Sequence, residues 1–174
     1  MTEQLFLLRH PAQATSDFMF DLQRFAENVT YLDADGATQT APSATNITSD
    51  TTALTAGWYV VDSDITINHT LTISGEVHLI LAANAKLTVN GDTGYGIHCT
   101  TADGGTNSSL EIFVQSLGSG ELIISNTAND KAAVKFDDGC NLTINGGKIT
   151  ATATNYRAMD ISDDLTINGG QITA

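Results

Sequence analysis

Two pairs of aspartates, Asp137-Asp138 and Asp163-Asp164, have the residue type and spacing of a metal site. Each pair directly follows a short apolar strand pattern, and the two patterns belong to successive copies of a repeat. Copies stacked in register would bring the pairs roughly 5 Å apart, the spacing of neighbouring strands. Ca2+ takes about 6–8 oxygen ligands, which carboxylates and backbone carbonyls could supply. The pattern therefore predicts a calcium site, with a solvated acidic turn as the alternative.

A second candidate site, for sugars, combines three aromatic and two basic side chains: Trp58, Tyr95, Tyr156, Lys135 and Arg157. The apolar faces of aromatic rings can stack on sugar rings, and Lys and Arg can donate hydrogen bonds to their oxygens. Charge pairing between neighbouring strands is the alternative for the two basic residues. For Trp58, the alternative is a packing contact near the first repeat.

No catalytic residues are predicted. A uronate lyase needs a basic residue beside a carboxylate whose charge a cation neutralises. A glycosidase needs two opposed carboxylates in a cleft. Lys135 and Arg157 near the aspartates are the best candidates for a lyase, and ordinary charge pairing explains them better. His78 and His98 fall on outward strand positions and are expected to be surface residues.

The elements that would position these residues follow from a repeat near the C-terminus. Residues 141–151 and 164–174 share the pattern Leu-Thr-Ile-Asn-Gly-Gly-X-Ile-Thr-Ala, and Leu142 and Leu165 lie 23 residues apart. Alternation of apolar and polar residues indicates strands, and Gly-Gly indicates a bend. A fixed period of roughly 20–50 residues is typical of stacked repeat proteins. We therefore expect an all-β, right-handed parallel β-helix, a solenoid of about five three-strand rungs over residues 57–174.

Alignment of the repeats predicts which residues stack. Apolar columns should face the interior: Ile65, Leu87, Leu110, Leu142 and Leu165; Leu122, Ile149 and Ile172; Ile97, Val134 and Met159; Cys99, Phe136 and Ile161. Burial of each Ile or Leu contributes about 1.5–3 kcal/mol. His98, Lys135 and Asp160 form an outward column, and Asn145 and Asn168 an asparagine ladder at a bend. An insertion at 115–118 or 127–130 accounts for the long step from Leu110 to Leu142, and the strand that ends at Ala174 suggests a continuation.

Residues 1–56 do not repeat. Phe18, Leu22 and Phe25 share one face of a predicted amphipathic helix over 16–27, and the Thr- and Ser-rich stretch 33–50 is predicted to be a linker. The helix could cap the apolar end of the solenoid, dock a partner or serve as a targeting segment.

Composition restricts the partners. The chain has 20 acidic and 7 basic residues, a formal charge of −13, which disfavours nucleic acid and anionic lipid as partners.

No stretch approaches the ~20 apolar residues of a membrane span. The sequence contains no recognisable Sec signal peptide, so we expect either that export uses another route or that the natural chain begins elsewhere. The two cysteines, Cys99 and Cys140, match neither a metal motif nor a disulfide framework and are expected to be lone buried thiols. The sequence specifies no oligomeric state.

The repeat, with the blocks 57–62 and 77–91, resembles the bacterial carbohydrate-binding β-helix family, which is pectate-lyase-like in fold. The resemblance covers residues 57–174. It implies an extracellular or cell-surface protein that binds polysaccharide, that can use calcium, and that lacks established lyase residues. We therefore expect a non-catalytic, adhesin-like module. A structural stalk or spacer and a calcium-dependent polysaccharide lyase are the alternatives.

Overall fold

The computed structural model describes residues 25–102, 104–116 and 119–174, and the regular elements there are all β-strands. The strands are β1 (Phe25–Leu32), β2 (Thr38–Asn46), β3 (Ala53–Leu54), β4 (Gly57–Val61), β5 (Ile65–Ile67), β6 (Leu71–Ser74), β7 (Glu76–Leu81), β8 (Lys86–Gly91), β9 (Ile97–Thr100), β10 (Ser108–Val114), β11 (Glu121–Asn126), β12 (Val134–Phe136), β13 (Cys140–Ile144), β14 (Lys148–Ala153), β15 (Met159–Ile161), β16 (Leu165–Ile167) and β17 (Gln171–Thr173). The described residues contain no helix of the length and apolarity that a membrane span requires.

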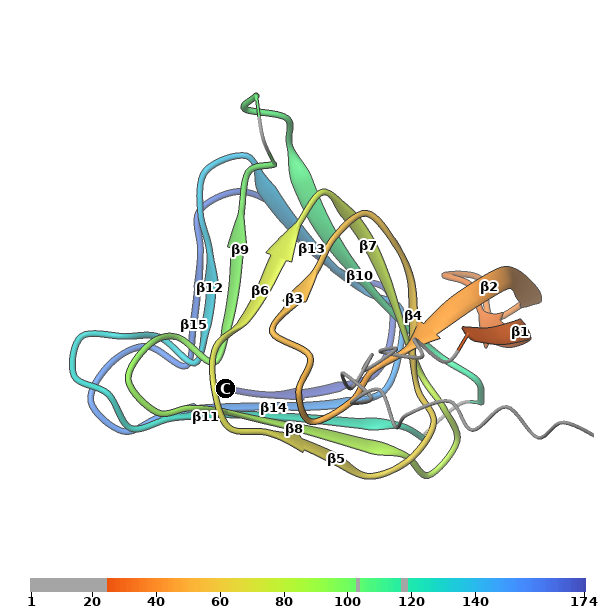
Figure 1. Cartoon of the computed structure of the whole chain (residues 1–174), viewed down its shortest axis with the longest axis horizontal. Helices are drawn as coiled ribbons and strands as arrows, with labels where there is room; N and C mark the ends of the chain where they lie inside the picture. The colour runs from red at the N-terminus through yellow and green to blue at the C-terminus, as the bar shows by residue number, and fades with distance from the viewer. Residues whose placement is uncertain (1–24, 103, 117–118) are drawn as a thin grey trace, which may run out of the picture.

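The strands form three sheets around a common interior (Figure 1). Sheet A has seven strands in the order β1-β2-β4-β7-β10-β13-β16. Sheet B has the order β15-β12-β9-β6-β3, and sheet C the order β17-β14-β11-β8-β5. From β4 onward, successive strands enter sheets A, C and B in rotation, and neighbours within each sheet are parallel. We call three such consecutive strands a rung, so that β4–β6, β7–β9, β10–β12 and β13–β15 are rungs.

The register confirms the predicted repeat. Leu142 pairs with Leu165, and Ile144 with Ile167, in adjacent strands of sheet A. The other columns predicted for sheets B and C are also found: Ile97, Val134 and Met159; Cys99, Phe136 and Ile161; Leu122, Ile149 and Ile172.

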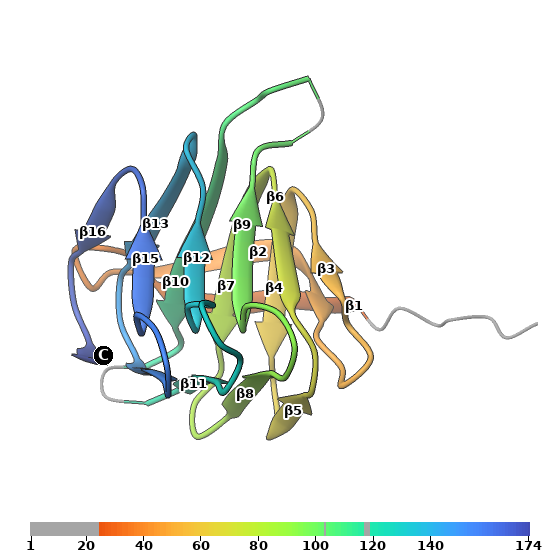
Figure 2. The ribbon, with the colours of Figure 1, turned by 90° about the vertical axis from the view of Figure 1, so that its left-hand side faces the viewer.

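One predicted column is wrong. Leu87 does not pair with Leu110; it pairs with Leu122 in sheet C, whereas Leu110 pairs with Val77 in sheet A. Strands of all three sheets share the alternation of apolar and polar residues, so the pattern identifies strands without saying which sheet each one joins. The connection from β9 to β10 is also an extended loop, which Figure 2 shows projecting beyond the strand ends. Sequence spacing alone did not predict this loop.

Inward side chains form one continuous core. Leu87, Ile124 and Phe136 are at most 1% exposed, as expected for residues covered by strands on both sides and by two facing sheets. Ile144 is fully buried, but its partner Ile167 is 50% exposed, because β16 is the last strand of sheet A and is covered on one side only. Burial therefore depends on having a rung above and below.

The N-terminal helix prediction is wrong where the structure can test it. Residues 25–27, the end of the predicted helix 16–27, begin strand β1, and residues 16–24 lie outside the described residues. The predicted linker 33–50 contains the nine-residue strand β2, which pairs antiparallel with β1. Pairing and packing override the helical periodicity here. Phe25, which the helix would have buried with Phe18 and Leu22, is 61% exposed, whereas Val29 is buried against sheet A.

The β1–β2 hairpin closes through a turn at Asp33. The Asp33 carboxylate accepts hydrogen bonds from the Asp35 N–H (3.1 Å), the Ala37 N–H (2.8 Å) and the Gln39 side chain (2.8 Å). The bonds from Gln39 and Ala37 hold the pKa of Asp33 below its usual value. Asp is favoured in turns because its side chain can bond backbone N–H groups a few residues further on.

The hairpin joins sheet A through a short pairing of β2 with β4 and folds over the outer side of β4, β7 and β10, where it forms a second apolar cluster. Val29, Ala41 and Ala44 of the hairpin meet Val60, Ile80 and Phe113 of the sheet. We call this cluster, together with Tyr31 and Trp58, the hairpin interface. The ring centroid of Tyr31 lies 4.9 Å from that of Trp58 and 4.6 Å from that of Phe113. Trp58 is therefore a packing residue between the hairpin and sheet A.

Candidate functional site

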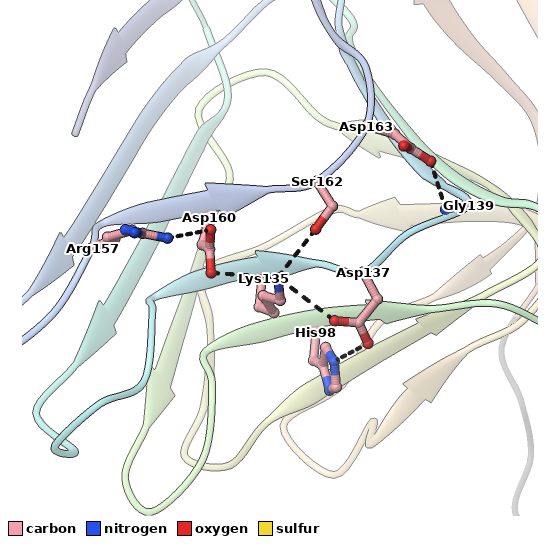
Figure 3. Close-up of polar contacts among 8 residues, drawn as sticks. All are labelled: His98, Lys135, Asp137, Gly139, Arg157, Asp160, Ser162 and Asp163. Atoms are coloured by element: carbon pink, nitrogen blue, oxygen red, sulfur yellow. Dashed lines mark hydrogen bonds and ion pairs between the residues drawn. The ribbon is translucent and has the colours of Figure 1, made fainter.

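Charged side chains gather on the outer side of sheet B, which we call the polar face. His98, Lys135 and Asp160 occupy equivalent positions in β9, β12 and β15, as the sequence predicted. Their strand neighbours point inward, so that alternation along three stacked strands places these side chains together on the surface. Asp137 and Arg157 flank this column and complete the polar face (Figure 3).

Lys135 lies at the centre of the contacts in the polar face. Its Nζ is 3.4 Å from Asp160 Oδ2, 3.8 Å from Asp137 Oδ1 and 3.3 Å from Ser162 Oγ. Only 18% of the Lys135 side chain is exposed. The ammonium group is therefore held in one position between two carboxylates, and its charge is largely compensated.

Each carboxylate also has a second basic partner. His98 Nε2 lies 2.9 Å from Asp137 Oδ2, and Arg157 donates a 2.9 Å hydrogen bond to Asp160 Oδ1. Burial would raise the pKa of Asp160, but the hydrogen bonds from Arg157 and Lys135 outweigh burial and lower it. Asp160 is therefore ionised at neutral pH, and the polar face presents fixed charges of both signs.

Three loops that connect sheet C to sheet B project side by side next to the polar face (Figure 1). We call these loops, residues 92–96, 127–133 and 154–158, the corner loops. They carry Tyr95, Lys131 and Tyr156 in successive rungs. Lys131 Nζ lies 4.7 Å from the ring centre of Tyr95, and the Tyr95 ring lies 4.6 Å from His98. The aromatic and basic groups of the loops thus continue the polar face.

Buried Asn126 at the end of β11 holds two of the corner loops. Its side-chain amide donates to Gly94 O (2.5 Å) and Ala132 O (3.0 Å), and its carbonyl accepts the Ala128 N–H (2.6 Å). Only glycine fits at position 96, because a Cβ there would lie 2.4 Å from Ile124 Cγ2 and 2.7 Å from Ala133 O. The position of Tyr95 therefore depends on side chains behind it that cannot touch a ligand.

Replacement of Asn126 by alanine should destabilise the protein, because two carbonyls and one N–H lose their partner. We expect a loss of about 1–3 kcal/mol in the free energy of unfolding, measured by urea denaturation. The matched control is Asn155→Ala, which removes an exposed 3.0 Å bond to Asn129 and should change stability by about 0.5 kcal/mol or less. Equal losses in the two variants would contradict the positioning role of Asn126.

The structure brings together four of the five side chains predicted to bind sugar. Tyr95, Tyr156, Lys135 and Arg157 lie on the corner loops or the polar face, whereas Trp58 lies in the hairpin interface on sheet A. Two further groups of this region were missed as site residues: His98 and Lys131. His98 could have been included, because it occupies the same predicted outward column as Lys135 and Asp160.

Two of the four aspartates predicted to bind calcium make other contacts, and the other two are exposed. Asp137 faces His98 and Lys135, and Asp163 accepts the Gly139 N–H at 2.5 Å. Asp138 and Asp164 are exposed. Across 25–102, 104–116 and 119–174, no three His, Cys, Asp or Glu side chains are arranged to hold a metal ion. Calcium binding stays a prediction.

A cleft of about 430 Å3 lies on the other side of the molecule, between the hairpin turn and the Asn-Gly-Gly bends of the last rungs. It is lined by Asp33–Gly36, Asn145–Lys148 and Asn168–Gln171, together with Leu32 and Val114. Asn168 donates a 2.7 Å hydrogen bond to Asn145 Oδ1, which confirms the predicted asparagine ladder. The cleft contains none of the side chains predicted to bind sugar or metal.

Comparison with known proteins gave no matching family model, no matching curated protein and no matching solved structure.

Proposed function

We propose that the chain is a right-handed parallel β-helix, exported to the cell surface or the extracellular space, that binds polysaccharide without catalysis. The observation that supports this most is the repetition of aromatic and basic side chains along one edge. Tyr95, Lys131 and Tyr156 recur in three successive corner loops, beside the ordered charges of the polar face. A polymer with repeating units is the ligand that a surface with repeating groups can contact several times.

The chemistry of this surface favours a neutral or weakly acidic polysaccharide. Lys135, Arg157 and His98 can donate hydrogen bonds to hydroxyl or carboxylate oxygens, and Asp137 and Asp160 can accept them from hydroxyls. A strongly anionic polymer would be repelled by the net charge of −13, which the few basic groups of this face offset only locally.

Binding to a glycan array tests the proposal, followed by calorimetry on the polysaccharides retained. Replacement of Tyr156 by alanine should weaken binding by about tenfold or more, as expected for an aromatic anchor of a binding site. The matched control is Gln171→Ala in the cleft, which should leave the affinity unchanged. If Gln171→Ala weakens binding and Tyr156→Ala does not, the site is wrong. If no glycan binds at all, the stalk or spacer function is favoured.

One observation favours the lyase alternative. His98 is hydrogen-bonded to Asp137 and lies beside Lys135, so an imidazole and an ammonium group are available as a base and as a partner for a substrate carboxylate. Release of unsaturated product from pectin with Ca2+, followed by its near-ultraviolet absorbance and abolished by His98→Gln, would replace the non-catalytic function with this one. We expect no product.

We further propose that calcium binds at the acidic turns of residues 137–138 and 163–164. A ligand that binds only the folded state stabilises it, by about 2.7 kcal/mol at a concentration of 100 Kd. Millimolar Ca2+ should therefore raise the melting temperature, and Asp163→Asn should reduce that rise. Mg2+ at the same concentration is the control, because it prefers a smaller and more rigid site. An unchanged melting temperature in millimolar Ca2+ removes the metal from the proposal.

A further inference from the structure

The two cysteines of the chain lie at the same corner of the core, although they are 41 positions apart in the sequence. Cys99 lies in β9 of sheet B, and Cys140 begins β13 of sheet A. Both side chains are fully buried, in the same cluster. Because they come from different sheets, their proximity depends on the corner at which sheets B and A meet.

Backbone hydrogen bonds define that corner. Cys99 pairs in register with Phe136, and the Asp137 N–H donates to the Cys99 carbonyl at 3.1 Å. The Cys140 N–H then donates to the Asp137 carbonyl at 3.1 Å. Cys140 of β13 pairs in register with Ser108 of the neighbouring strand β10. The Ser108 N–H donates a 2.9 Å hydrogen bond to the Gly139 carbonyl. The two cysteines therefore lie diagonally across one hydrogen-bonded corner, and both point inward.

The two thiols are buried at the same corner of the core, one rung apart. Burial raises the pKa of both, and for Cys99 the contact with Cys140 raises it further. Each group is therefore a neutral thiol at physiological pH. Since the thiolate is the form that reacts, the pair is protected while the protein is folded and can react while the core forms or opens.

We propose that Cys99 and Cys140 form a disulfide when the chain folds in the presence of a small-molecule disulfide. One cysteine thiolate attacks the donor, forms a mixed disulfide and releases one thiol. The second cysteine thiolate attacks the protein sulfur of that mixed disulfide and releases the second thiol. The protein loses two protons and two electrons, which together equal two hydrogen atoms, and the donor is reduced to two thiols.

The cross-link would enclose the entire third rung. The strands β10, β11 and β12, with their connecting loops, all lie between the two cysteines. Closing a loop of this length restricts the unfolded chain and stabilises the folded one, so the oxidised protein should melt on the order of 10 °C higher than the reduced one. The inference does not depend on any ligand.

The test is to refold the full chain with oxidised and reduced glutathione. We expect an intact mass lower by two hydrogens, a peptide pair joined through Cys99 and Cys140 before reduction, and a higher melting temperature that dithiothreitol reverses. The double variant Cys99→Ala/Cys140→Ala should show no effect of dithiothreitol. Alkylation of both thiols of the wild-type chain after oxidative refolding, or a lower melting temperature of the cross-linked form, would overturn the proposal. The mass and alkylation measurements need no variant, so they stand even if the double variant does not fold.

Discussion

Replacement of Phe136 by alanine is expected to lower the free energy of unfolding by about 3–5 kcal/mol, the usual range for a buried aromatic. Phe136 is fully buried and lies in register between Cys99 of one neighbouring strand and Ile161 of the other. Both neighbours belong to strands held by parallel pairing, so the surrounding structure cannot collapse into the space left behind. Urea denaturation followed by circular dichroism gives the midpoint and the slope of the transition.

The matched control for this prediction is Phe25→Ala. The same side chain is removed, but Phe25 is 61% exposed at the start of β1. We expect its loss to change stability by about 0.5 kcal/mol or less. Similar losses in the two variants would mean that Phe136 does not occupy the core, and the stacking of sheet B would have to be revised.

Replacement of Trp58 by alanine should weaken the attachment of the β1–β2 hairpin to sheet A. Trp58 is stacked on His78 with ring centroids 4.3 Å apart, and it also contacts Tyr31 and Phe113. We expect a loss of about 3 kcal/mol, near the low end for truncation of a large aromatic, because Trp58 is only partly buried. Protease cleavage in the hairpin turn, residues 33–37, should become faster.

A comparison with Tyr156→Ala separates packing from ligand binding. Tyr156 is 43% exposed on a corner loop, so its loss should weaken polysaccharide binding and leave stability nearly unchanged. Trp58→Ala should do the reverse, with normal affinity at temperatures where the variant is folded. Loss of affinity in Trp58→Ala under those conditions would place Trp58 in the binding site, as the sequence first predicted.

Much of the architecture could be predicted from local patterns. The alternation around Leu142 and Ile144, repeated at Leu165 and Ile167, was enough to predict strands, their parallel pairing and their register. The outward column of His98, Lys135 and Asp160 followed from the same alignment. These predictions succeed because a strand alternates its side chains regardless of context, and stacked copies of one repeat must share a register.

Other predictions failed where an element depends on what it packs against. Residues 25–27 have the apolar spacing of a helix end, but pairing with β2 makes them a strand. The Thr-rich stretch 38–46 has no strong apolar pattern, yet Ala41 and Ala44 are fully buried against sheet A. Small side chains carry a weak hydrophobic signal, so their burial can be known only from the surface that covers them.

The amino-acid sequence by itself determined that this chain forms strands, that those strands stack in parallel repeats, and which side chains of each strand face inward. Local alternation and a repeat period are enough to predict these features, because each feature depends only on residues that lie a few positions or one repeat apart in the sequence. Only the tertiary structure decided which sheet each strand joins, that Trp58 lies under the hairpin, and that Cys99 and Cys140 lie at one corner of the core. Those contacts depend on the lengths and paths of loops, which set distances in space that no periodic pattern encodes.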